Sequence, residues 1–216
     1  MIINDDLGAF MKVPVAMGNR AARLIDQLFF ARLLKNPMQA DGKTLFHSGH
    51  KNLLTGSSSA LSADSLKKAV QMYLDQVDAD GQPISVEPRI LLVPTALKHL
   101  AIELTRGATL IMAGGSDNMI RPALNVLTDE NLQVVSSPYL GNSAYEGASQ
   151  TAWYLFGAPG QVDTFEIGFL NGKRTPTVER GETDYNTLGM WFRVYFDLGV
   201  REQDFRGMLK ANGAAN

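Results

Sequence analysis

The chain of 216 residues contains no cysteine and only three histidines. The missing cysteines exclude disulfides, thiolate metal ligands and cysteine nucleophiles together. The two signs of charge nearly balance: 20 Lys and Arg stand against 22 Asp and Glu, a net charge of -2, so no field draws the whole molecule toward DNA or a membrane surface. No apolar run approaches the roughly 20 residues that cross a bilayer as a helix. The acidic start, "MIINDDLGAF", lacks the features of a signal peptide, so we expect a soluble, cytoplasmic protein.

The remaining composition, with 45% apolar and 19% charged residues, is typical of a folded chain. One long helix is predicted over residues 14–36, because Pro14 suits a first helical turn and Pro37 ends the pattern. Its length is about 35 Å at 1.5 Å per residue. Apolar side chains recur along it at three- and four-residue spacing, at Met17, Ala21, Leu24, Leu28 and Ala31, widened by Ile25, Phe29 and Leu33.

A polar loop is predicted over residues 37–60, followed by a second helix for which Ser62 is the cap. The run "PRILLVP", residues 88–94, is short and continuously apolar, which is typical of a buried strand. Thr95 is then placed to cap a short helix that ends at Gly107.

The second half of the chain consists of strand-like runs rich in β-branched and aromatic residues. Asn171-Gly172 predicts a hairpin turn, because this dipeptide favours positive φ angles. In "MWFRVYFDLGV" the alternation places Trp191 and Arg193 on one face and the residues that follow them on the other. The predicted fold class is therefore α+β, with helices first and then mostly antiparallel strands.

Two histidines, His47 and His50, come close together in "LFHSGHKN" and raise the possibility of a catalytic metal site. A catalytic zinc takes three protein ligands. The glutamate of the H-E-x-x-H motif is missing, and the remaining histidine, His99, falls inside a predicted helix. We therefore interpret the pair as loop histidines that make local hydrogen bonds, and keep a metal-dependent hydrolase using His47, His50 and a carboxylate as the alternative.

Other patterns are no closer to a catalytic site. "IMAGGSDN", residues 111–118, lacks the spacing and the lysine of a phosphate-binding loop and is interpreted as a mobile turn. No G-x-S-x-G occurs, and we predict no enzyme activity and no cofactor. The basic residues are mixed with acidic ones rather than arranged as a cationic stripe, which speaks against the third hypothesis, a small nucleic-acid-binding module. As contact residues for other subunits we single out Arg20, Arg23, Arg32 and Arg174.

The order of parts resembles the major capsid protein of tailed phages with the Hong Kong 97-type fold, and in particular the capsid segment that some prophages encode fused to a prohead protease. The resemblance covers nearly the whole chain, and its specificity lies in the sequence of four stretches. These are "IINDDLGAF" before the long helix, "ADGKTLFHSGHKNL" after it, "PRILLVPTALKHLA", and "DYNTLGMWFRVYFDLGVREQDFRGML" near the end.

The resemblance implies a long spine helix over 14–36 and a mostly antiparallel β-sheet, without catalytic residues or cofactor. It implies a peripheral domain of residues 1–59 with 158–200, and an axial domain of 60–157 with 201–216. Loops 107–121 and 139–150 would meet around symmetry axes.

The resemblance also implies the partners and the location. The partners would be copies of the same chain, in capsomers of five or six in a full-length context, forming a shell that encloses DNA. No specific nucleic-acid site and no membrane contact are expected. Assembly would take place in the bacterial host's cytoplasm, and the finished location would be the virion capsid.

One departure concerns the N-terminal side. Members of the family carry an N-terminal arm and a long extended loop before the spine helix. Met1 stands only a dozen residues before the predicted helix, so we expect this chain to lack both. The chain is then a major head subunit or its core fragment, with three origins open: a C-terminal piece of a longer capsid polyprotein, a trimmed form, or a degenerate prophage product.

Overall fold

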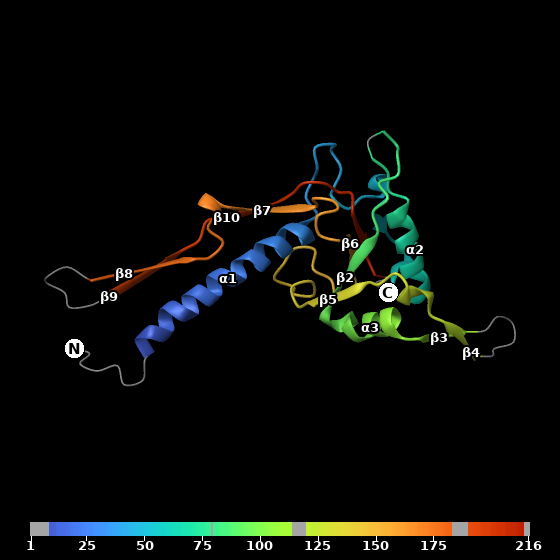
Figure 1. Cartoon of the computed structure of the whole chain (residues 1–216), viewed down its shortest axis with the longest axis horizontal. Helices are drawn as coiled ribbons and strands as arrows, with labels where there is room; N and C mark the ends of the chain where they lie inside the picture. Colours follow the sequence, from blue (N-terminus) through green and yellow to red (C-terminus); the bar gives the residue numbers. More distant parts are fainter. Residues whose placement is uncertain (1–8, 79, 114–119, 183–189, 214–216) are drawn as a thin grey trace. The chain divides into compact units, whose positions relative to one another are not determined.

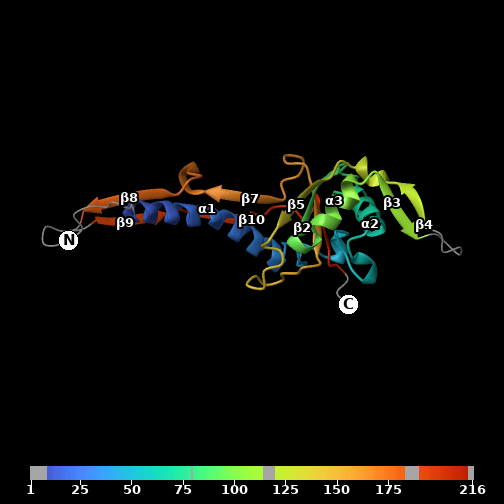
Figure 2. The ribbon, with the colours of Figure 1, turned by 90° about the horizontal axis from the view of Figure 1, so that it is seen from below.

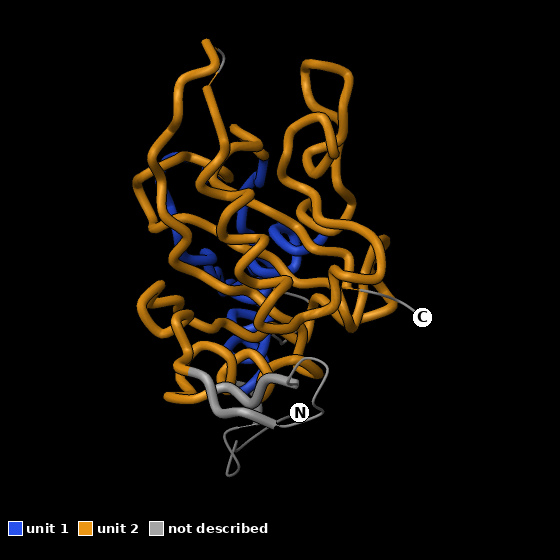
Figure 3. Tube along the Cα trace, turned by 90° about the vertical axis from the view of Figure 1, so that its right-hand side faces the viewer, with its two compact units in different colours: residues 1–31, 166–201 blue, residues 32–165, 202–216 orange. Residues whose placement is uncertain are grey.

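The computed structural model describes residues 9–78, 80–113, 120–182 and 190–213 (Figure 1). The chain divides into two compact units, which are coloured separately in Figure 3. Unit 1 consists of residues 1–31 and 166–201, and unit 2 of residues 32–165 and 202–216. Helices and several sheets are both present, so the α+β class is confirmed. The division into a peripheral and an axial domain stays a prediction.

The long helix α1 spans Ala9–Lys35. It begins five residues earlier than predicted, and Pro14 lies inside it rather than in its first turn. Its C-terminal end agrees with the prediction, because Asn36 turns to a positive φ of 50° just before Pro37. The Asn36 side chain fixes this turn: its Oδ1 accepts from the N–H of Phe46 and its Nδ2 donates to the Phe46 carbonyl.

Unit 2 is built on a five-stranded sheet with the strand order β1-β11-β6-β2-β5. The sheet is mixed: β1 and β11 are parallel, as are β2 and β5, whereas β6 is antiparallel to both of its neighbours. The strands are β1 (Leu53–Leu54), β2 (Pro88–Pro94), β5 (Gln133–Ser137), β6 (Trp153–Gly157) and β11 (Met208–Ala211). Strand β2 confirms the buried strand predicted from its apolar run.

Both faces of this sheet are buried at β6, which explains its continuous apolar sequence. Trp153 and Leu155 pack into the core shared with α2 (Ala63–Leu74) and α3 (Lys98–Arg106). The indole N–H of Trp153 donates to the Ser59 carbonyl at 3.0 Å. On the opposite face Tyr154 packs against Phe46, with ring centroids 5.6 Å apart.

The two short helices of unit 2 begin differently. Ser62 caps α2 as predicted, in a reciprocal capping box with Ser65. The predicted cap at Thr95 is wrong, because Thr95 starts a 3-10 turn, η3 (Thr95–Leu97), that leads into α3 without a side-chain cap. Gly107 ends α3 as expected. The other 3-10 turns are η1 (Ser48–His50), η2 (Ser57–Ser59), η4 (Val126–Thr128) and η5 (Leu170–Gly172).

An antiparallel pair is formed by β3 (Thr109–Ala113) and β4 (Ile120–Leu124), so residues 109–113 and 120–121 of the loop predicted over 107–121 are in strands. Both views show it leading away from α2 and α3 (Figures 1 and 2). The mobile turn predicted at 111–118 is wrong for residues 111–113, which are in β3, and its remainder lies outside the described residues.

Strands β7 (Phe165–Phe169) and β10 (Leu198–Glu202) form one two-stranded sheet, and β8 (Thr177–Glu182) and β9 (Met190–Tyr195) form another. The hairpin predicted at Asn171-Gly172 is therefore wrong: the two residues have positive φ angles, but β7 and β8 pair with other strands. The N–H of Leu170 instead donates to the Asp197 carbonyl, at the end of the β7–β10 pair.

Among the described residues, no helix combines the length and the apolar character that a membrane span requires.

Candidate functional site

His50, one of the two loop histidines, is buried and has both ring nitrogens engaged. Nε2 lies 2.7 Å from Asp41 Oδ2, and Nδ1 lies 3.3 Å from the Leu45 carbonyl oxygen. The ring stacks on Phe205 at a centroid distance of 3.8 Å and an angle of 9°. The hydrogen bond from His50, helped by the backbone N–H of Lys43, lowers the pKa of the Asp41 carboxyl. His50 therefore links the loop to the segment before β11.

His47 has a different structural role in the same loop. Its Nδ1 accepts from the N–H of Gly49 at 2.9 Å and so caps η1. The His47 and His50 rings are 6.0 Å apart, and His99 is exposed on α3. Within the described ranges no group of three or more His, Cys, Asp or Glu side chains could hold a metal. The local hydrogen bonds predicted for the histidines are thus present.

Asn52 is the residue of this loop that sequence reasoning missed. It is fully buried, its Oδ1 accepts from the N–H of His47, and its Nδ2 donates to the carbonyls of Leu45 and Phe205. One amide thereby joins two points of the loop to the segment before β11, which is far away in sequence. The sequence did offer a signal for this role, because Asn52 stands directly before the apolar pair of β1. An asparagine that is buried there needs hydrogen-bond partners for its side-chain amide.

Arg32, one of the four predicted contact residues, is engaged within its own chain. Its Nε and Nη2 lie 2.6 and 2.8 Å from the two carboxylate oxygens of Glu202, which is buried. This paired geometry fixes the guanidinium, and the hydrogen bonds that it donates to Glu202 raise the pKa of Arg32. Both residues belong to unit 2.

The other three predicted contact residues are exposed in unit 1. Arg20 and Arg23 lie one turn apart on α1. Arg174 follows η5, where its guanidinium carbon lies 6.0 Å from the centre of the Phe169 ring. The structure therefore brings Arg20 and Arg23 together on one element, whereas Arg32 is held by Glu202.

Unit 1 has almost no hydrophobic core of its own. Among its described side chains only Pro14 and Phe30 are buried. The predicted apolar stripe of α1 is only partly covered: Met17 is exposed, whereas Ala21, Leu24 and Leu28 are half-buried. Outside the stripe, Val13 and Val15 near the start of α1 are also exposed. The buried apolar side chains of the described chain otherwise belong to unit 2. Unit 1 thus presents apolar surface that the single chain does not cover.

Strands β8 and β9 present an exposed aromatic face in the same unit. As predicted, Trp191 and Arg193 share this face, and Tyr195 continues it. Arg193 pairs across the strands with Glu179 and lies 5.5 Å from the Tyr195 ring centre. The hydrogen bond from Arg193, followed by one from the Tyr195 hydroxyl, lowers the pKa of the Glu179 carboxyl. Gly181 makes room for the Trp191 ring, since a Cβ there would lie 2.5 Å from the indole.

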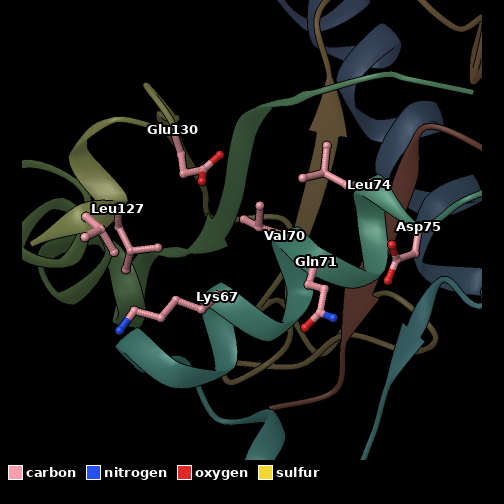
Figure 4. A pocket seen from close by; sticks show the side chains of 8 residues that line it. Lys67, Val70, Gln71, Leu74, Asp75, Leu127 and Glu130 are labelled. Carbon is pink, nitrogen blue, oxygen red and sulfur yellow. The ribbon is translucent and has the colours of Figure 1, made fainter.

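Unit 2 carries a groove between α2 and η4, with a volume of about 260 Å³ (Figure 4). The core residues Val70 and Leu127 line it together with the exposed side chains of Leu74 and Val126. Polar and charged side chains complete the lining, at Lys67, Gln71, Asp75 and Glu130. The groove is mainly apolar, which suits an apolar side chain better than a small polar substrate.

A family model described as "Phage capsid protein" matches residues 1–211 of the chain. No curated protein matches.

Proposed function

Because the chain belongs to the phage capsid protein family, we propose that it is a major head subunit of a phage or prophage, which assembles with copies of itself into a shell that encloses DNA. In this proposal the fold is of the Hong Kong 97 type and α1 is its spine helix. A peripheral domain comprises residues 1–59 with 158–200, and an axial domain comprises 60–157 with 201–216. The subunit works without catalysis or cofactor.

The observation that carries the proposal is the open apolar surface of unit 1. A unit that buries only Pro14 and Phe30 among its described side chains gains little stability from its own packing. Covering the stripe of α1 with a neighbouring subunit would remove this surface from water. Each contact of this kind buries on the order of 800 Å² per partner, and a closed shell engages several contacts per subunit at once.

The proposed contact residues are those expected from the sequence. Arg20 and Arg23 are exposed on α1, and Arg174 is exposed after η5, so all three are available to a neighbouring carboxylate. Arg32 enters such a contact together with its partner Glu202, as a fixed ion pair rather than as a free cation.

The test is the association state of the purified chain. We expect light scattering to rise with protein concentration, and negative-stain electron microscopy to reveal rings, capsomers or shells. The Arg20→Glu/Arg23→Glu variant should need several-fold more protein to reach the same scattering, whereas Lys98→Glu, which reverses an exposed cation on α3, should not. Equal urea midpoints of the three proteins would establish that folding is unchanged. A chain that stays monomeric at every concentration would contradict the proposal.

A further inference from the structure

An exposed leucine stands at the turn between β7 and β8. Leu170 is 60% exposed, yet its backbone is well held. Its N–H donates to the Asp197 carbonyl at 3.1 Å, and its own carbonyl accepts from the N–H of Lys173 at 3.2 Å. Behind it, the rings of Phe169 and Phe196 stack at 5.9 Å. The turn therefore presents a large apolar side chain to solvent from a fixed backbone.

Two cations follow this leucine after Asn171 and Gly172. Lys173 and Arg174 are both exposed, and within the described ranges neither forms an ion pair. The guanidinium of Arg174 lies over the Phe169 ring, which keeps it beside the turn. We call Leu170, Lys173 and Arg174 the knob. The knob combines an aliphatic side chain with two positively charged ones.

The groove of unit 2 has the complementary chemistry. Leu74 and Val126 are 43% and 50% exposed on its sides, and the buried Val70 and Leu127 are also part of its lining. Figure 4 shows Val70 lying between Glu130 on one side and Leu74 on the other. Within the described part of the chain, the groove carboxylates of Asp75 and Glu130 form no ion pair.

We propose that the knob of one copy docks into this groove of a second copy, with Leu170 in the apolar part and Lys173 and Arg174 against Asp75 and Glu130. The inference rests on the proposed function, because it names the contact through which copies associate. Knob and groove are different surfaces of the same chain, so the contact is heterologous. A contact of this type repeats from copy to copy and forms a ring or a shell when its rotation closes.

Two variants each disable one half of the contact. Leu170→Asp places a charge where the anchor docks, and Gln71→Trp fills the groove from an exposed position on α2. We expect each variant alone to associate at least tenfold more weakly than the natural chain in sedimentation velocity. An equimolar mixture should form a one-to-one dimer and stop there, because it combines one intact knob with one intact groove. Met38→Asp, at an exposed position outside the groove, should associate normally.

A charge exchange tests the polar half of the contact. Arg174→Glu and Glu130→Arg should each weaken association several-fold, and the double variant should recover it. If both knob and groove variants associate like the natural chain, or if their mixture forms no dimer, the contact is wrong while the shell proposal stands. If the natural chain itself stays monomeric at every concentration, the proposed function fails and the contact fails with it. Normal self-association of both variants with loss of binding to another protein would assign the groove to that protein.

Discussion

Replacing Asn52 by alanine should destabilise the protein more than replacing His47, a less buried residue of the same loop. The Asn52 amide makes three hydrogen bonds inside the protein, to the N–H of His47 and to the carbonyls of Leu45 and Phe205. Alanine removes all three and fills none of the space. The Leu45 carbonyl still faces His50 Nδ1, so the His47 N–H and the Phe205 carbonyl lose the most.

The expected loss of stability follows from the number of hydrogen bonds that are removed. A net value of about 1 kcal/mol per hydrogen bond gives a decrease of about 3 kcal/mol in the free energy of unfolding. For a chain of this size that corresponds to a fall of about 6–12 °C in Tm. His47→Ala should lose less than about 1 kcal/mol, because it gives up one hydrogen bond to the N–H of Gly49 at a partly exposed site.

The assay is urea unfolding followed by tryptophan fluorescence, since Trp153 is fully buried in the core. It is carried out at a concentration where scattering detects no association. A loss below about 0.5 kcal/mol for Asn52→Ala would refute the structural account of the loop. An increase in stability on adding zinc, present in the natural chain but absent from a His47→Ala/His50→Ala variant, would refute it in favour of a metal site.

Three further outcomes are expected. Tyr154→Phe should leave stability unchanged or slightly raised, because the buried Tyr154 hydroxyl has no hydrogen-bond partner among the described residues. Tyr73→Phe should cost about 1 kcal/mol for its lost hydrogen bond, and equal losses in urea would contradict this. The pKa of Asp41 is lowered on folding, so its carboxylate stabilises the fold above the unfolded pKa of about 3.9, and this stabilisation is lost as the pH falls through the folded pKa. The difference in free energy of unfolding between the natural chain and Asp41→Asn should therefore shrink in acid. A difference that does not change with pH would refute the pairing of Asp41 with His50. Gly181→Ala should displace the Trp191 ring, seen as altered acrylamide quenching, and an unchanged quenching curve would contradict the close approach.

The local parts of the fold were predictable because their signals are local. The end of α1 at Asn36, the cap at Ser62 and the apolar strand β2 each depend on neighbouring residues. The start of α1 was not predictable in this way. A proline is favoured in the first turn of a helix, but Pro14 lies further inside α1. The turn at Asn171 was predicted with the right φ angle but the wrong strand partners.

The strand partners and the hydrogen-bond partners of Arg32 and Asn52 could not be predicted for one physical reason: they depend on contacts between distant segments. Strand β11 lies between β1 and β6, and nothing in its short sequence specifies either neighbour. Arg32 was chosen as an exposed cation, but its carboxylate partner Glu202 is 170 residues away. Asn52 likewise bonds to Phe205 across 153 residues. The small number of buried side chains in unit 1 became visible only when burial there could be compared with burial in unit 2.

The central claim is that this chain acts by associating with copies of itself, and negative-stain electron microscopy of the purified protein over a concentration series tests it most directly. The account predicts closed rings, capsomers of five or six, or shells, which grow in number with concentration. Single particles of one subunit at every concentration would contradict it.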